Sequence, residues 1–195
     1  MKQVEQDKVS LIFLSKKLFH SNSVRSFLQV LEKNTGSSRV VNLPDNLYQI
    51  SEDLVEDLRT IYIPFGLQLF DGIQYSISLS IRPQPTEWKA FVLEIEGDKI
   101  ANRLLGEGGN RTFINWLIEL LSTGGRMTRA ECAFLCFGES SQTIELLCWE
   151  HGGLNLEHLP PIFWMAAHRV TNLSSITTKA SPIKQSDGSV LLMSL

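Results

Sequence analysis

The middle of the chain carries a regular alternation of side-chain types, and this pattern constrains the fold more than any other feature. Between residues 74 and 81 every second position is apolar and the intervening positions are serines. The apolar positions are Tyr75, Ile77, Leu79 and Ile81, and the serines are Ser76, Ser78 and Ser80. Because successive side chains of a strand point to opposite faces of a sheet, this segment is predicted to be a strand with one core face and one wet face.

Residues 88–96 follow a turn that contains Pro83 and Pro85, and they are again rich in strand-forming residues. An antiparallel hairpin with residues 74–81 is therefore predicted. Further strands are predicted over residues 9–14, 131–137 and 143–149, the last two forming a second hairpin. Residues 183–195, around Asp187 and Gly188, are expected to form a last hairpin or a loose tail.

Apolar side chains at helical spacing predict amphipathic helices over residues 21–36, 52–62 and 113–122. Ser51 and Thr112 are the expected N-caps of the second and third helices, and Pro64 is expected to help end the second. Two leading prolines favour a short helix over residues 160–169. This order predicts an α+β fold, with an antiparallel sheet built from hairpins and helices packed on it. We expect one domain over residues 1–195, with residues 175–195 as a peripheral hairpin or tail.

Size, charge and cysteine content narrow the class of protein. A chain of 195 residues can bury roughly two thirds to three quarters of its unfolded surface without a metal or disulfide. Cys132, Cys136 and Cys148 are an odd number in apolar surroundings, which favours buried thiols in a reducing compartment, and we predict a cytoplasmic protein. The apolar run at residues 9–14 is too short for a signal segment or membrane span, and the net charge of −3 argues against a nucleic-acid surface.

A glycine-rich stretch over residues 106–112 resembles a phosphate-binding loop but lacks its spacing. A P-loop needs glycines separated by four residues and followed by Lys and Ser/Thr, whereas the glycines here stand at 106, 108 and 109, with Arg111 where a lysine belongs. A flexible turn before a helix explains the stretch. No cofactor is predicted.

Two constellations raise the alternative of a metal-dependent hydrolase or nuclease. Glu87 and Lys89 have the carboxylate-x-lysine spacing of such nucleases, with Asp71 upstream as a second ligand. A simple hairpin would separate Asp71 from Glu87 by about eight strand residues, roughly 25 Å, so the ligands would not meet. The other constellation is Cys148, His151 and His158, whose spacing matches no familiar zinc motif.

Cysteine catalysis with His20 or His168 requires an accessible, low-pKa thiol, and the apolar neighbours of the cysteines favour inert core thiols instead. The chain also has no Gly-x-Ser-x-Gly elbow. We therefore predict no catalytic, metal or cofactor residues, with the enzyme kept as an alternative.

The segment between Arg39 and Arg59 is acidic, because it holds five carboxylates and no Lys or Arg. These are Asp45, Glu52, Asp53, Glu56 and Asp57. One interpretation is structural: acids in a first helical turn favour the helix dipole, and a charged face opposite an apolar stripe is ordinary solvated surface. The other is a patch complementary to a basic partner, with aromatic anchors from Tyr48, Tyr62, Phe65 and Phe70.

The chain size, the acidic segment at residues 51–57, the hairpin at residues 75–88 and the lack of active-site motifs together resemble the immunity proteins of bacterial polymorphic-toxin and contact-dependent systems. The resemblance implies a non-enzymatic protein that neutralises a cognate toxin by covering its active site or an adjacent surface. On that basis Glu52, Asp53, Glu56 and Asp57, together with Tyr48, would meet the basic face of a toxin such as a nuclease and mimic phosphate charge. A third alternative is a structural or adaptor subunit that forms homodimers through the serine face or an edge strand.

Overall fold

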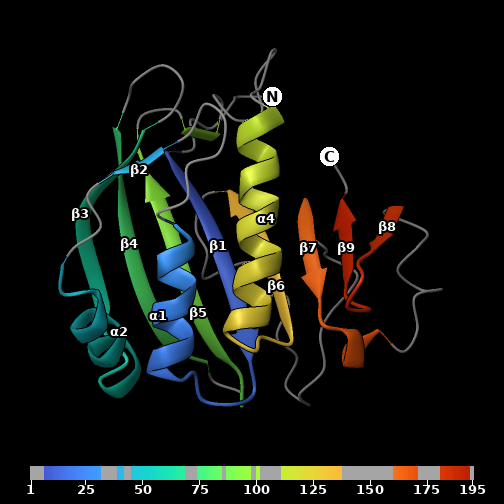
Figure 1. The fold of residues 1–195 in the computed structure, drawn as a ribbon, viewed down its shortest axis with the longest axis horizontal. Coiled ribbons are helices and arrows are strands. Elements are labelled where there is room, and N and C mark those ends of the chain that lie inside the picture. Colours follow the sequence, from blue (N-terminus) through green and yellow to red (C-terminus); the bar gives the residue numbers. More distant parts are fainter. Residues whose placement is uncertain are drawn as a thin grey trace.

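The computed structural model describes residues 7–31, 39–41, 45–68, 74–84, 87–97, 100–101, 111–137, 160–170 and 181–193. The strands of these segments form one nine-stranded sheet in the order β2-β3-β4-β5-β1-β6-β7-β9-β8 (Figure 1). Their bounds are β1 Lys8–Ser15, β2 Arg39–Val41, β3 Thr60–Gln68, β4 Gln74–Pro83, β5 Lys89–Glu96, β6 Cys132–Phe137, β7 Ile162–Met165, β8 Ser181–Lys184 and β9 Val190–Met193. Every neighbouring pair is antiparallel.

The helices lie on one face of this sheet (Figure 1). They are α1 Ser21–Val30, α2 Leu47–Glu56 and α4 Arg111–Met127, and a short 3-10 turn, η2 Ala167–Arg169, follows β7. Helix α4 packs against β1, β6, β7 and α1, and α2 packs against α1, β3 and β4. The predicted α+β class is confirmed. No helix in the described part of the chain is long and apolar enough to span a membrane.

Strand β1 lies at the centre of the sheet and is buried on both faces. Val9, Leu11 and Phe13 join the core beneath the helices, whereas Ile12 and Leu14 join a second apolar cluster on the opposite face. This explains why the sequence of β1 is an almost unbroken apolar run instead of an alternating one. The predicted strands at residues 9–14, 74–81, 88–96 and 131–137 and the last hairpin are all confirmed.

Two consecutive glycines let α4 approach the sheet closely. A Cβ on Gly124 would lie 2.6 Å from a ring atom of Phe27 and 2.7 Å from one of Phe13, and a Cβ on Gly125 would lie 2.5 Å from the Trp164 ring. Such distances are shorter than van der Waals contact, so neither position has room for a side chain without repacking. The rings of Phe13 and Phe27 meet edge to face with centroids 5.0 Å apart, beneath the helix.

The predicted bounds of the second helix are wrong. Helix α2 begins at Leu47, five residues before the predicted start, and ends at Glu56, and residues 60–62 belong to β3. Ser51 is a buried mid-helix residue whose hydroxyl donates to the carbonyl of Tyr48, so it is not an N-cap. The chain leaves the helix through Leu58, which has a positive φ of 51°. Pro64 lies within β3 and does not end the helix.

Residues 160–169 are also not the predicted helix. They form β7 and η2, because residues 162–165 pair with both β6 and β9. Trp164 faces the main core and Phe163 the second cluster, so strand alternation replaces helical periodicity. Helix α4 begins at Arg111, which places Thr112 inside the helix instead of at its N-cap. The predicted strand at residues 143–149 lies outside the described residues.

The serine face of β4 is not the solvent-exposed surface that the alternation of apolar residues and serines predicts. Ser76 is exposed, but Ser78 and Ser80 are only 2% exposed. Ser78 donates to Glu94 across the β4–β5 pair, and the Ser80 hydroxyl accepts a hydrogen bond from the Arg82 guanidinium at 3.0 Å. The serines therefore take part in a polar network within a covered face.

Candidate functional site

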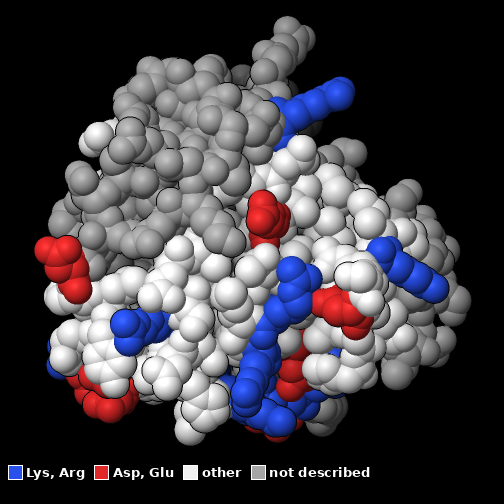
Figure 2. All heavy atoms as spheres, in the orientation of Figure 1, with Lys and Arg blue, Asp and Glu red and all other residues white. Residues whose placement is uncertain are grey.

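The predicted partner-binding residues all lie on α2 and its C-terminal end, at one margin of the sheet. We call this set the α2 surface: Tyr48, Glu52, Asp53, Glu56 and Asp57. Tyr48 is 46% exposed, and Glu56 and Asp57 are exposed as well. Acidic side chains are visible at the lower left of Figure 2, the corner that α2 occupies in Figure 1. The buried side of α2, which includes Leu47, Ile50 and Leu54, holds the helix against the core.

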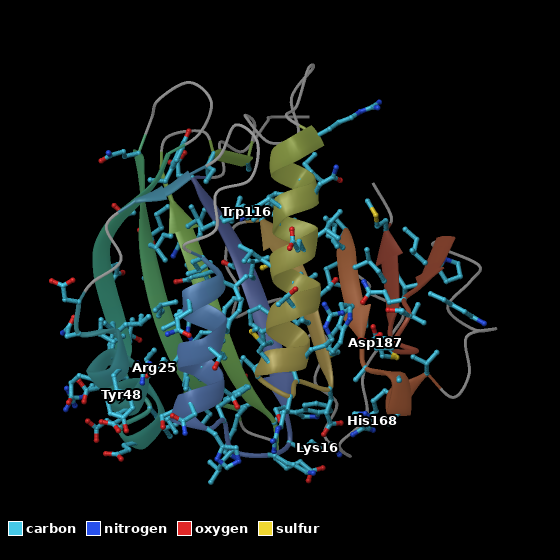
Figure 3. The ribbon with its side chains drawn as sticks, in the orientation of Figure 1. Lys16, Arg25, Tyr48, Trp116, His168 and Asp187 are labelled. Carbon is cyan, nitrogen blue, oxygen red and sulfur yellow. The ribbon has the colours of Figure 1, made fainter. Side chains whose placement is uncertain are left out.

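Tyr48 is held between a cation and an anion. The Arg25 guanidinium of α1 lies 4.9 Å from the centroid of the Tyr48 ring, and the two side chains lie together in Figure 3. The hydrogen bond between the Tyr48 phenol and Glu52 raises the pKa of Tyr48 above its usual value, and the negative charge of Glu52 adds to the effect. An aromatic side chain with two charged partners is a restrained anchor at the solvent surface.

Only part of the negative charge is balanced locally. Asp57 forms an ion pair with Arg59 at 2.6 Å, and Asp53 accepts a hydrogen bond from Gln49, one turn earlier, at 2.8 Å. With Asp45 included, the segment has five carboxylates, and the cations that contact it in the described part of the chain are Arg59, at Asp57, and Arg25, at Tyr48, so these seven charged side chains carry a net charge of −3.

The observed bounds of α2 place these acids where helix energetics disfavours them. The first turn contains no acid and the last turn no base, so the carboxylates gather in the second half of the helix. Negative charge there opposes the partial negative charge of the helix C-terminus. Glu52 and Glu56 are also spaced i, i+4, as are Asp53 and Asp57, and like charges at this spacing repel. The interpretation that these acids stabilise a first helical turn is therefore wrong.

Two further exposed apolar side chains follow α2. Leu58 is 40% exposed and Tyr62 is 68% exposed. Tyr62 pairs with Ser78 in β4, whereas its neighbour Ile61 packs against the main core, so the Tyr62 side chain points to the sheet face opposite the helices and not to the α2 surface. The positive φ of Leu58 is a conformation that favours glycine over leucine. An exposed leucine in this position contributes little to the core and adds backbone strain. The side chains of Phe65 and Phe70, the other predicted aromatic anchors, lie outside the described residues.

The residues of the alternative enzyme do not assemble into a site in the described part of the chain. Glu87 is ion-paired with Lys16 at the start of β5, and Lys89 is the first residue of that strand. Asp71, Cys148, His151 and His158 lie outside the described residues. Among the residues that are described, no three His, Cys, Asp or Glu side chains are grouped closely enough to hold a metal ion. Cys132 and Cys136 are buried and not in disulfides.

A buried carboxylate organises the polar network on the covered face of the sheet. Glu94 is 6% exposed, and it lies 3.5 Å from the Lys8 ammonium and 3.3 Å from the Arg82 guanidinium. Burial alone would lower the pKa of Lys8, but its hydrogen bond with Glu96 and the charges of Glu94 and Glu96 outweigh that effect and raise it. The network neutralises Glu94 with cations from two strands, so we assign it a structural role.

The structure also forms a cavity of about 380 Å³ at the C-terminal end of α4, which no sequence motif indicated. Its wall includes Lys17 and His20 from the segment before α1, Arg129 from the segment after α4, and Trp164 and His168 from β7 and η2. The two histidines considered as partners for a catalytic cysteine therefore share one cavity, although neither cysteine described lines it. Sequence reasoning missed the site because its residues are up to 174 positions apart, from Ser15 to Ser189.

The chain shows no significant match to any protein-family model, to any curated protein or to any solved structure with which it was compared.

Proposed function

We propose that this chain is a non-catalytic binding protein whose α2 surface docks on a basic patch of a partner protein. The observation that carries the proposal is the position of the acids at the C-terminal half of α2. There they repel one another and oppose the helix dipole, so they lower the stability of the free protein. A binding role gives a reason for retaining them, because a cationic partner would turn this repulsion into attraction.

The chemistry of the surface supports a charged interface with apolar anchors. Tyr48 supplies a restrained aromatic ring, and Leu58 adds exposed apolar area next to Asp57 in the chain. Such side chains are typical of the residues that dominate binding energy, whereas a ring of carboxylates mainly speeds association and selects the partner. In accord with the resemblance to bacterial immunity proteins, we propose that the partner is a toxin with a basic substrate-binding face and that binding takes place in the cytoplasm.

The test is capture of a partner from host lysate followed by measurement with the purified pair. The double variant Glu52→Gln, Glu56→Gln removes two charges from the α2 surface, and Glu87→Gln, Glu119→Gln removes two exposed charges elsewhere as the matched control. We expect the first variant to weaken binding by tenfold or more, mainly through slower association, and the control to bind as the native chain does. High salt should reduce the difference between them.

Equal affinity of the two variants would refute docking through the α2 surface. The toxin assignment needs its own measurement, which is growth of cells that express the captured partner with and without this chain. A partner that is harmless when expressed alone would refute the immunity role and leave the docking surface in place.

A further inference from the structure

We infer that the cavity at the end of α4 binds a small phosphate monoester with an apolar body. The cavity is distinct from the α2 surface and has a volume of about 380 Å³, which is within the usual range for small-molecule sites. Lys and Arg side chains gather at the lower centre of Figure 2, where the C-terminal end of α4 lies in Figure 1. His168 and Asp187 lie beside that end of the helix (Figure 3).

The first step of the argument concerns charge. The cavity wall contains two carboxylates, and both are neutralised within the protein: Glu131 is ion-paired with Arg169, and Asp187 lies 3.3 Å from the Arg126 guanidinium. Asp187 also accepts hydrogen bonds from Ser189, which lower the pKa of its carboxyl group. The wall is therefore left with an excess of cations.

The second step identifies the available cations. Within the part of the chain that the structure describes, the side chains of Lys17 and Arg129 make no ion pair or hydrogen bond, although both line the cavity. Two cationic side chains match a group that carries close to two negative charges at neutral pH, as a phosphate monoester does. The imidazoles of His20 and His168 line the same wall and can donate to phosphate oxygens.

The third step concerns the backbone of Arg129. The amide of Ala130 donates to the carbonyl of Gly125, and that of Arg129 to the carbonyl of Arg126, which is the hydrogen-bond pattern of a Schellman motif. Arg129 stands at the position that usually holds glycine and has a φ of 55°. An arginine is strained here where a glycine would not be, and such backbone strain is common at functional sites. The same hydrogen bonds satisfy the carbonyls of Gly125 and Arg126 in the last helical turn, which reduces their repulsion of an anion.

The remaining wall suits an apolar body. Ala130, Ala166 and the Trp164 indole provide apolar surface.

The test is calorimetric titration of the full chain with phenyl phosphate, with phenol and benzoate as comparison ligands. We expect saturable binding of phenyl phosphate with a dissociation constant of about 1 mM or tighter, and at least tenfold weaker binding of phenol and benzoate. Arg129→Gly should weaken phenyl phosphate binding about tenfold, because it removes a charge-assisted hydrogen bond. The same variant should raise the Tm, because glycine relieves the positive φ, so lost binding would not reflect lost folding.

Lys17→Gln should also weaken binding, whereas Arg111→Gln, at the far end of α4, should not. Absence of saturable phenyl phosphate binding would overturn the inference. Phenol or benzoate binding as tightly as phenyl phosphate, or unchanged binding by Arg129→Gly, would also overturn it.

Discussion

The placement of acids on α2 makes a quantitative prediction about Glu56. Replacing it with lysine removes the repulsion from Glu52 one turn earlier and creates an i, i+4 attraction, each worth about 0.2–0.5 kcal/mol. It also exchanges an unfavourable charge at the helix C-terminus for a favourable one, which adds roughly 0.3–1 kcal/mol. Glu56 is exposed, so solvent screening reduces these terms.

We therefore expect Glu56→Lys to increase the free energy of unfolding by about 1 kcal/mol at low salt, which for a chain of this length raises the Tm by about 2–4 °C. Glutamate and lysine have similar helix propensities, so propensity does not account for the change. The measurement is thermal unfolding followed by circular dichroism at about 20 mM and about 1 M NaCl. Because the Debye length at the higher concentration is only about 3 Å, most of the gain should disappear there.

The matched control is Glu119→Lys. Glu119 lies at the middle of α4, is exposed, and has no charged residue three or four positions away. It undergoes the same change in net charge without the helix-end or i, i+4 effects, so its Tm should remain within about 1 °C of the native value. An unchanged Tm for Glu56→Lys, an equal rise for both variants, or a rise that persists in high salt would contradict the reasoning.

Three more expectations concern backbone geometry and pH. Gly125→Ala should lower the free energy of unfolding by about 1–3 kcal/mol, as seen by urea denaturation, because the added methyl group collides with the buried Trp164 ring. Leu58→Gly should raise it by roughly 1 kcal/mol by relieving the positive φ, and the reasoning fails if stability falls instead. Because the pKa of Asp187 is lower in the folded protein than in the unfolded chain, its ionised carboxylate contributes to the free energy of unfolding. This contribution is fully present above the pKa of the unfolded chain and is lost as the pH falls through the pKa of the folded protein. Asp187→Asn should therefore be less stable than the native chain at pH 7, and the two stability curves should converge on acidification below about pH 3.8, the usual value for an aspartate; parallel curves would count against the hydrogen bonds from Ser189.

Much of the sheet could be predicted from local patterns. The alternation in β4 and the apolar run in β1 identify strands, because a period of two is set by backbone geometry and not by neighbours. The same patterns do not report what covers each face. Ser78 and Ser80 look like surface residues in the sequence, yet both are buried in a polar network around Glu94.

Two predicted helices differ most from the structure, because strand pairing or turn geometry overrides a local sequence signal in each. Residues 160–169 have a helix-like start, but β6 and β9 offer hydrogen-bonding edges on both sides, so the segment forms β7. For α2, Ser51 resembled a cap because it precedes a run of acids. In the structure the helix begins at Leu47, so those acids lie near its C-terminus. Their interaction with the helix dipole is therefore unfavourable instead of favourable.

Periodicity and composition predict the α+β class, the main strands and an acidic, aromatic segment, because none of these depends on a particular tertiary contact. Folding places the acids at the unfavourable end of α2 and brings Lys17, Arg129 and His168 to the wall of one cavity. Neither result can be predicted from local patterns, because helix bounds and cavity walls depend on contacts between distant segments, and such contacts leave no periodic signal in the chain.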